Sequence, residues 1–327
     1  MRLLHLLAPL FFLSYPLFAE NGGCFRFFPD SFRVVDSIPA YAVAKNRFVS
    51  IGCPDGKKIV SHDRFTGLCI FEENASRPLY MSDAKPPLYL CPDKKRADKA
   101  IRSYPVSVFP GKVAVDTEHG GAIFSGCCKL AGIFGKGGIW FDASSIKRIL
   151  GGKTLHGDIG ARFKTENGAV TVEAVDPFSG CDLKPGDRVI KAGRKSRPDL
   201  RYLLETIDEC KPHDKFRLVV ERGGAVHEIN ASCFERFGGG KISDTFLERF
   251  GMEFSSSLRI IHLDSASISY MKGLRLGDKL LMIDGKAVES ETDVRALLSG
   301  YVIQKSTPGN MLWERDGFQF FLLPTSL

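Results

Sequence analysis

The C-terminal half of the chain carries one sequence pattern twice. The motif LKPGDRVI at Leu183–Ile190 returns as LRLGDKLL at Leu274–Leu281, 91 positions later. Two further pairs occur at the same or nearly the same offset: Ile159-Gly160-Ala161 with Phe250-Gly251-Met252, and Glu221-Arg222 with Glu314-Arg315. Three motifs in one order at nearly one spacing indicate a duplicated domain, so the fold must contain two copies of one architecture behind a different N-terminal part.

The elements of the first repeat (154–233) can be predicted from its sequence. Ala169–Val175 alternates as a strand, and a Pro-Gly-Asp turn within the first motif leads into a buried strand. Pro198–Ile207 has helical spacing, and Gly223-Gly224 separates the strands of a hairpin. The second repeat (242–325) is expected to follow the same order after a linker at Phe237–Lys241.

Both repeats resemble PDZ domains of the kind found in bacterial periplasmic proteases. In that family a peptide adds as a strand between an edge strand and a helix, and amides of a Φ-G-Φ loop hold its C-terminal carboxylate. The resemblance implies these groove residues: Ile159, Gly160, Ala161, Leu200 and Leu204 in the first repeat, and Phe250, Gly251, Met252, Val294 and Leu298 in the second. The alternative is that the apolar residues are only core positions of a fold used as a rigid spacer.

The residue before each loop differs between the repeats. Arg249 precedes the second loop, where a cation would help to hold a carboxylate, whereas Asp158 precedes the first loop, where an anion would oppose one. The second repeat is therefore expected to prefer free C-termini. The first is expected to bind an internal segment or to be blocked by its own protein.

The N-terminus and the cysteines indicate export. Residues 1–19 contain one basic residue, an apolar run and a final Ala19, which predicts a signal peptide, with an uncleaved anchor as the alternative. We therefore expect a periplasmic protein. The nine cysteines lack zinc spacing, so disulfides are expected rather than a metal site, and the odd number leaves at least one thiol free in a monomer. Cys127 and Cys128 would pair with different partners, because neighbours on a strand face opposite sides.

Residues 20–150 have no counterpart in the repeats and predict a β-barrel or sandwich of short strands. The expected strands are Arg33–Val35, Tyr41–Val43, Phe48–Ile51, Lys58–Val60, Leu68–Phe71, Leu88–Leu90, Val106–Phe109 and Lys112–Val115.

The end of this domain resembles the second barrel of HtrA-type, trypsin-like proteases. The resemblance rests on EHGGAIF at Glu118–Phe124, KLAGIF at Lys129–Phe134, and the segment Gly137–Leu150. It implies a mainly β fold with some α, in which a degenerate trypsin-like β-barrel domain precedes two PDZ domains. His119 would occupy the place of the nucleophilic serine, and a histidine there cannot form an acyl-enzyme through a hydroxyl. The alternatives are a small disulfide-bonded β domain of other ancestry, and a cysteine nucleophile at Cys127.

These features predict a non-catalytic scaffold or assembly protein that binds periplasmic or envelope proteins through PDZ grooves, with self-assembly possible. No cofactor, metal or small-molecule substrate is expected, and the dispersed basic residues of this +7 chain argue against nucleic acid. Asn74 and Asn230 lie in an acidic-x-Asn-x-Ser setting that resembles the Campylobacter glycosylation acceptor. The architecture resembles disk scaffold proteins of the Campylobacter-type flagellar motor. The rivals are a periplasmic chaperone or quality-control adaptor and an active HtrA-like protease.

Overall fold

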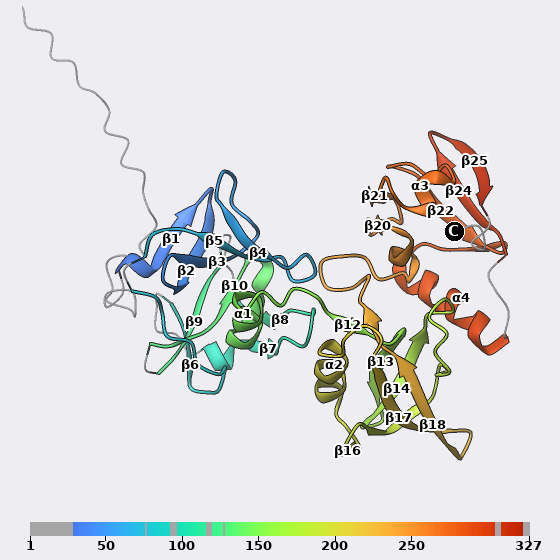
Figure 1. The fold of residues 1–327 in the computed structure, drawn as a ribbon, viewed down its shortest axis with the longest axis horizontal. Helices are drawn as coiled ribbons and strands as arrows, with labels where there is room; N and C mark the ends of the chain where they lie inside the picture. The colour runs from blue at the N-terminus through green and yellow to red at the C-terminus, as the bar shows by residue number, and fades with distance from the viewer. Residues whose placement is uncertain are drawn as a thin grey trace, which may run out of the picture.

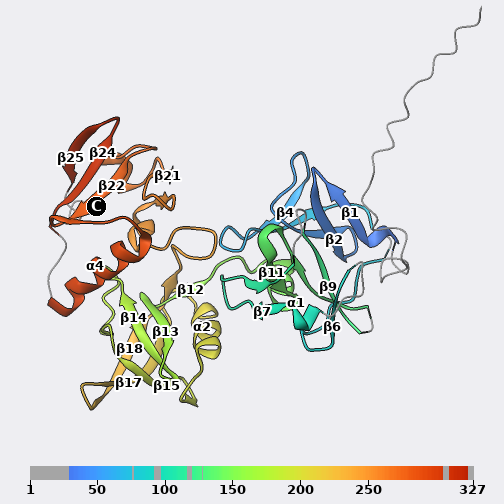
Figure 2. The same ribbon diagram turned by 180° about the vertical axis from the view of Figure 1, so that it is seen from behind.

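The computed structural model describes residues 29–75, 77–91, 97–115, 120–126, 128–304 and 309–322. Strands dominate this part, which confirms the predicted mainly β class with some helix. The N-terminal domain lies at one end of the molecule and the two repeats lie at the other (Figures 1 and 2). The predicted signal peptide, His119 and Cys127 lie outside the described residues.

The N-terminal domain consists of two antiparallel sheets. The first has the order β1-β2-β3-β5-β4, and the second has the order β6-β9-β10-β11-β8-β7. The strands are β1 (Phe32–Val35), β2 (Ile38–Ala44), β3 (Arg47–Ile51), β4 (Ile59–His62), β5 (Leu68–Glu72), β6 (Leu88–Leu90), β7 (Ile101–Ser103), β8 (Gly111–Val113), β9 (Gly121–Ser125), β10 (Leu130–Phe134) and β11 (Ile139–Asp142). The predicted strand Val106–Phe109 is wrong: its ends form one isolated bridge, and β7 was not predicted.

The two sheets share one apolar core. Tyr41 and Ile70 from the first sheet meet Phe124 and Phe141 from the second, and all four side chains are buried. Helix α1 (Ala143–Leu150) follows β11 directly and adds its apolar face to this core. This continuity makes the two sheets one folding unit rather than two independent domains.

The two repeats have matching elements. The first contains β12 (Gly157–Asp158), β13 (Ala161–Glu166), β14 (Ala169–Val175), β15 (Arg188–Ala192), β16 (Lys195–Ser196), α2 (Leu200–Asp208), β17 (Lys215–Arg222), β18 (Ala225–Ser232) and β19 (Phe234–Glu235). The second contains β20 (Met252–Phe254), β21 (Ile260–Leu263), α3 (Ile268–Met271), β22 (Lys279–Ile283), β23 (Lys286–Ala287), α4 (Glu291–Gln304), β24 (Met311–Arg315) and β25 (Phe318–Leu322). Helix α4 extends beyond the predicted Thr292–Leu298. Within the described residues, no helix has the length and apolar character needed to cross a bilayer.

The repeated sequence motifs meet in space. In the first repeat, Arg222 Nε lies 2.6 Å from Asp187 Oδ1, and in the second Arg315 Nε lies 2.6 Å from Asp278 Oδ1. Each aspartate side chain is almost wholly buried in the turn that precedes the central strand. The Gly-Asp and Glu-Arg motifs therefore recur together because they form one ion pair that ties this turn to the closing hairpin.

Disulfides occur in both parts of the molecule. Cys53 is bonded to Cys69 between β3 and β5, and Cys210 is bonded to Cys233 between the end of α2 and the start of β19. Cys128 is disulfide-bonded as well. The expectation that several of the cysteines form disulfides is confirmed for these residues.

The linker between the repeats packs against the N-terminal domain. The Lys241 amide donates to the Phe65 carbonyl at 2.7 Å, and Ile242 packs with Phe65 and Val108. A Cβ on Gly240 would lie 2.3 Å from the Phe65 carbonyl oxygen, so this approach requires glycine. The linker of the repeats is thus also the contact that joins them to the N-terminal domain.

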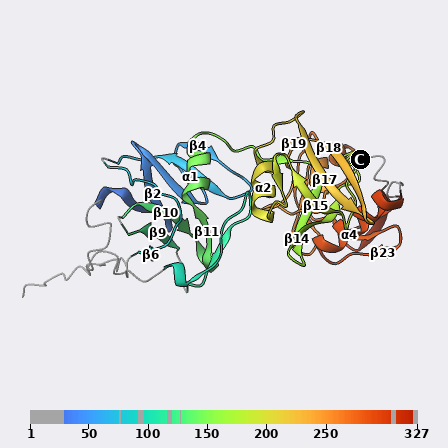
Figure 3. The same ribbon diagram turned by 90° about the horizontal axis from the view of Figure 1, so that it is seen from below.

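A buried histidine forms a second junction between the same domains. His156, just before β12, places Nε2 3.0 Å from Asp63 and Nδ1 2.5 Å from Asp208 at the end of α2, on the side of the first repeat that faces the N-terminal domain (Figure 3). Arg148 of α1 also contacts Asp208, at 2.9 Å. Burial lowers the pKa of His156, but the hydrogen bonds to Asp208 and Asp63 outweigh it and raise the pKa above the ordinary value.

This junction predicts a pH-dependent stability. Because the folded-state pKa of His156 is raised, its contribution is complete below the unfolded pKa and is lost as pH rises through the folded value. His156→Asn is expected to lose roughly 3 kcal/mol at about pH 6, since two buried carboxylates lose their shared cation. The thermal unfolding temperature of this variant should also fall less between about pH 6 and pH 8 than that of the wild type.

The control for this experiment is His262→Asn, at an exposed position. Burial raises the pKa values of Asp176 and Glu248 to about 6 and about 7, so both also lower the free energy of unfolding as pH rises. This contribution is the same in the wild type and in both variants. Parallel pH profiles for the wild type and His156→Asn would contradict the role given to His156.

Candidate functional site

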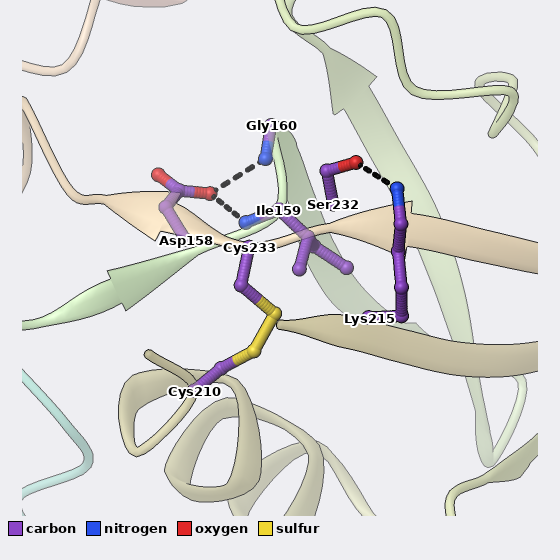
Figure 4. The surroundings of a disulfide bond; sticks show 7 residues. All are labelled: Asp158, Ile159, Gly160, Cys210, Lys215, Ser232 and Cys233. Carbon is purple, nitrogen blue, oxygen red and sulfur yellow. Dashed lines mark hydrogen bonds between the residues drawn. A yellow bond between two sulfur atoms is a disulfide. The ribbon is translucent and has the colours of Figure 1, made fainter. Parts of the chain in front are cut away.

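The loop predicted to hold a carboxylate in the first repeat already holds one. The amides of Ile159 and Gly160 both donate to Oδ1 of Asp158, at 2.7 and 2.8 Å (Figure 4). Ile159 and Ala161 are buried in the core of the repeat. The sequence predicts that this loop binds a peptide carboxylate, and the structure shows that its amides bind the preceding side chain.

An arginine holds the same carboxylate from its other side. Arg162 Nη1 lies 2.9 Å from Asp158 Oδ2, while Arg162 Nε and Nη2 each lie 2.7 Å from Asp244, just after the linker. Burial would lower the pKa of Arg162, but the charges of Asp158 and Asp244 raise it. Burial would likewise raise the pKa of Asp244, but Arg162 lowers it to about 2. Arg162 therefore lies between two carboxylates, and its charge keeps the pKa of Asp244 low.

The loop of the second repeat is arranged differently. The Gly251 amide donates to the Glu248 carbonyl at 2.9 Å, as the end of a short 3-10 helix, Leu247–Phe250. Met252 is buried in the core, while Phe250 and Gly251 are partly exposed. Here the glycine amide is used by the backbone itself and faces no side-chain carboxylate.

The two loop glycines have a structural reason that the sequence did not reveal. Gly160 and Gly251 have positive φ, and a Cβ on them would lie 2.3 and 2.5 Å from the Cβ atoms of Ser179 and Ser267. Each serine belongs to an equivalent turn, which follows β14 in the first repeat and β21 in the second. The sequence interpretation attributed these glycines to the approach of a peptide carboxylate, whereas the close packing of this turn already requires them.

Arg249 has a different partner from the expected peptide. Its Nη2 lies 3.3 Å from Asp176 in the first repeat, and its guanidinium stacks over Phe234 and Phe237. Beside this pair, Phe178 of the first repeat packs edge-on against Phe250 of the second, with ring centroids 5.0 Å apart. Arg249 therefore joins the two repeats.

The helix residues predicted to face the grooves differ in exposure between the two repeats. Leu200 and Leu204 on α2 are partly exposed beside the core of the first repeat. Val294 and Leu298 on α4 are 0% exposed and belong to the core of the second repeat, which corrects their assignment as groove-lining residues. Helix α4 instead uses another side to pack on the first repeat, where Ser299 Oγ accepts from the Val175 amide at 2.7 Å.

The described residues of the N-terminal domain hold one histidine, His62, and it lacks an orienting carboxylate. It is exposed at the end of β4, and its side chain forms no hydrogen bond or ion pair with the described residues. The adjacent Asp63 is bound to His156 and to Thr66 instead. Both ring nitrogens of His156 face carboxylates, so neither is directed at a nucleophile.

Asn74 and Asn230 are both exposed, Asn74 after β5 and Asn230 on β18. A modifying enzyme could reach either side chain in the folded state. Whether they are glycosylated stays a prediction.

The sequence reasoning missed several exposed apolar side chains on the second repeat. The largest are Met271 (70% exposed), Leu276 (65%), Phe318 (71%) and Phe321 (67%). The last two lie on β25, the edge strand of its sheet. The sequence signal was present in Phe318-Gln319-Phe320-Phe321, where three aromatic residues on one hairpin strand cannot all face a core.

Comparison with known proteins bears mainly on the first repeat. Residues 157–232 match the PDZ domain family, so the first repeat is a PDZ domain. No curated protein matches the chain. Solved structures with some similarity include the HtrA-type protease AlgW with a decapeptide (15% identity, 61% of this chain and 82% of that one, TM-score 0.42) and with a tripeptide (14%, 65% and 96%, 0.45). Another is the serine endoprotease from Yersinia pestis (13%, 65% and 97%, 0.43). Neither an activity nor a site is inferred from these distant similarities.

The contact between Arg249 and Asp176 predicts a coupling between the repeats. Burial, opposed by Arg249, raises the pKa of Asp176 to about 6. Arg249→Ala is expected to lower the free energy of unfolding by roughly 3 kcal/mol, because a buried carboxylate loses its partner. Asp176→Asn in the same chain should restore part of the loss, which a double-mutant cycle in thermal unfolding would measure.

Arg259→Ala, at an exposed arginine outside this contact, is the matched control. An Arg249→Ala protein with unchanged stability but weaker binding of peptides with free C-termini would instead restore the role predicted from sequence.

Proposed function

We propose that this protein is a non-catalytic, exported scaffold or assembly factor that binds other envelope proteins in the periplasm. It acts through contacts of its PDZ part, as a fixed component of a larger assembly such as the flagellar motor. The proposal makes binding, rather than turnover, the activity of the chain.

The observation that carries this proposal is a set of exposed apolar side chains on the second repeat. Phe318 and Phe321 are about 70% exposed on opposite faces of the edge strand β25. Met271 at the end of α3 and Leu276 just after it are similarly exposed. Exposed aromatic and aliphatic side chains on an unpaired edge favour contact with another chain, because burial removes their apolar area from water.

The junctions between the domains support a structural role. The linker, His156 and Arg249 each tie two domains together through buried contacts. A body held at several such points presents its binding surfaces at fixed distances, which suits a scaffold better than a carrier that must close around diverse clients.

The histidines support the non-catalytic part of the proposal. A Ser-His-Asp mechanism needs an imidazole that is held by a carboxylate on one nitrogen and faces the nucleophile with the other. His62 lacks the carboxylate, and His156 lacks a free nitrogen. Cys69, the strand partner of His62 on β5, is in a disulfide with Cys53 and cannot act as a thiolate.

In-cell crosslinking of the tagged full chain tests the proposed function. A few envelope proteins at fixed stoichiometry, or self-assembled arrays, are expected, and their capture should fall in the double variant Phe318→Asp/Phe321→Asp. Val226→Asp is the matched control, because Val226 is 65% exposed on a strand of the first repeat. A broad set of unrelated proteins would favour the quality-control adaptor instead.

Incubation with unfolded casein tests the protease alternative. The proposal predicts no cleavage by the purified full chain at any pH. Cleavage that is abolished by His119→Ala or Cys127→Ala would overturn the non-catalytic assignment.

A further inference from the structure

The first PDZ domain contains an anion site that its own chain fills. Two adjacent amides, of Ile159 and Gly160, converge on one oxygen of Asp158, and the Arg162 guanidinium lies 2.9 Å from the other oxygen. Paired backbone amides with a nearby arginine are the donor set that a peptide C-terminus would need. In this structure a side-chain carboxylate occupies the whole set (Figure 4).

The fold holds this carboxylate in place. Asp158 is 2% exposed and lies in β12, where it pairs with Phe234 of β19. The residue before Phe234 is Cys233, whose disulfide to Cys210 fixes β19 to the end of α2. On the other side of β12, a Cβ on Gly157 would lie 2.3 Å from the Ile207 carbonyl oxygen, so the strand is also pressed against α2. The Asp158 carboxylate, here called the cap, is thus held in place by a backbone that is fixed on both sides.

Displacing the cap would leave charges unpaired. A peptide carboxylate that took the two amides would leave Asp158 buried without its two amide hydrogen bonds and beside a second anion. Arg162 cannot compensate for both, because its other two donors are engaged with Asp244 at 2.7 Å. Two carboxylates cannot share one such site without a large electrostatic cost.

We infer that Asp158 sets the ligand class of the first PDZ domain: it excludes free C-terminal carboxylates and restricts the domain to internal peptide segments. This inference rests on the proposed function as a peptide-binding protein. An internal segment needs no carboxylate site, and it can still pair with β13, the edge strand of the sheet, whose Lys164, Thr165 and Glu166 are exposed. Removal of the Asp158 side chain would leave two free amides and one free donor of Arg162, which together form an open anion site.

Amide NMR of the ¹⁵N-labelled full chain tests this inference, with sodium acetate as the probe. In the wild type, the Ile159 and Gly160 resonances should not shift with acetate. In Asp158→Ala they should shift and saturate, with affinity for acetate at least about tenfold tighter than in the wild type, as expected for charge-assisted hydrogen bonds. Asp182→Ala, which removes an exposed aspartate of the same domain, should behave like the wild type.

Labelled pools of random decapeptides extend the test from an anion to peptides. Asp158→Ala should gain a preference of about tenfold for the free-acid pool over the amidated pool, measured at the same two resonances. Acetate-dependent shifts in the wild type, or no gain in a folded Asp158→Ala protein, would overturn the inference. If that variant does not fold, the wild-type acetate titration decides alone. Failure of partner capture in cells would contradict the proposed function and leave this result standing, because neither probe is a natural partner.

Discussion

The buried guanidinium of Arg162 is the contact on which the arrangement of the repeats depends. It bridges Asp158 before the first loop and Asp244 just after the linker, and the Asp244 amide donates in turn to Glu291 at the start of α4. A buried charge needs partners on every side, so the groups that neutralise Arg162 must come together for the chain to fold. One side chain thereby fixes the loop, the linker and the second repeat relative to one another.

The two repeats show how a duplicated fold can acquire different surfaces. The ion pair between the Gly-Asp turn and the closing hairpin is the same in both, at 2.6 Å, because it maintains the shared architecture. The residue before each loop is free of that requirement. In the first repeat it is Asp158, which turns inward onto its own amides, and in the second it is Arg249, which turns outward to Asp176 of the first.

Much of the fold could be predicted because it follows local patterns. The alternation in Ala169–Val175 matches β14 residue for residue, and the helical spacing around Leu203 and Ile207 matches α2. The site was harder, because its chemistry depends on partners distant in sequence. Nothing near Val294 or Leu298 shows that α4 directs both into a core, and nothing near Arg249 indicates a carboxylate more than 70 positions away. The sequence shows that Asp158 and Arg249 have opposite charges, but it does not show which residue each of them binds.

The sequence by itself determined the duplication, the mainly β class and the order of elements within each repeat. These properties follow from periodicity, turn residues and repeated motifs, which act over short distances along the chain. Only the tertiary structure decided that the first loop is capped by its own aspartate, that Arg249 joins the repeats, and that an apolar surface remains exposed on β25. Those outcomes depend on which buried charges are paired and which apolar faces are buried. Both are decided only when distant segments of the chain pack together.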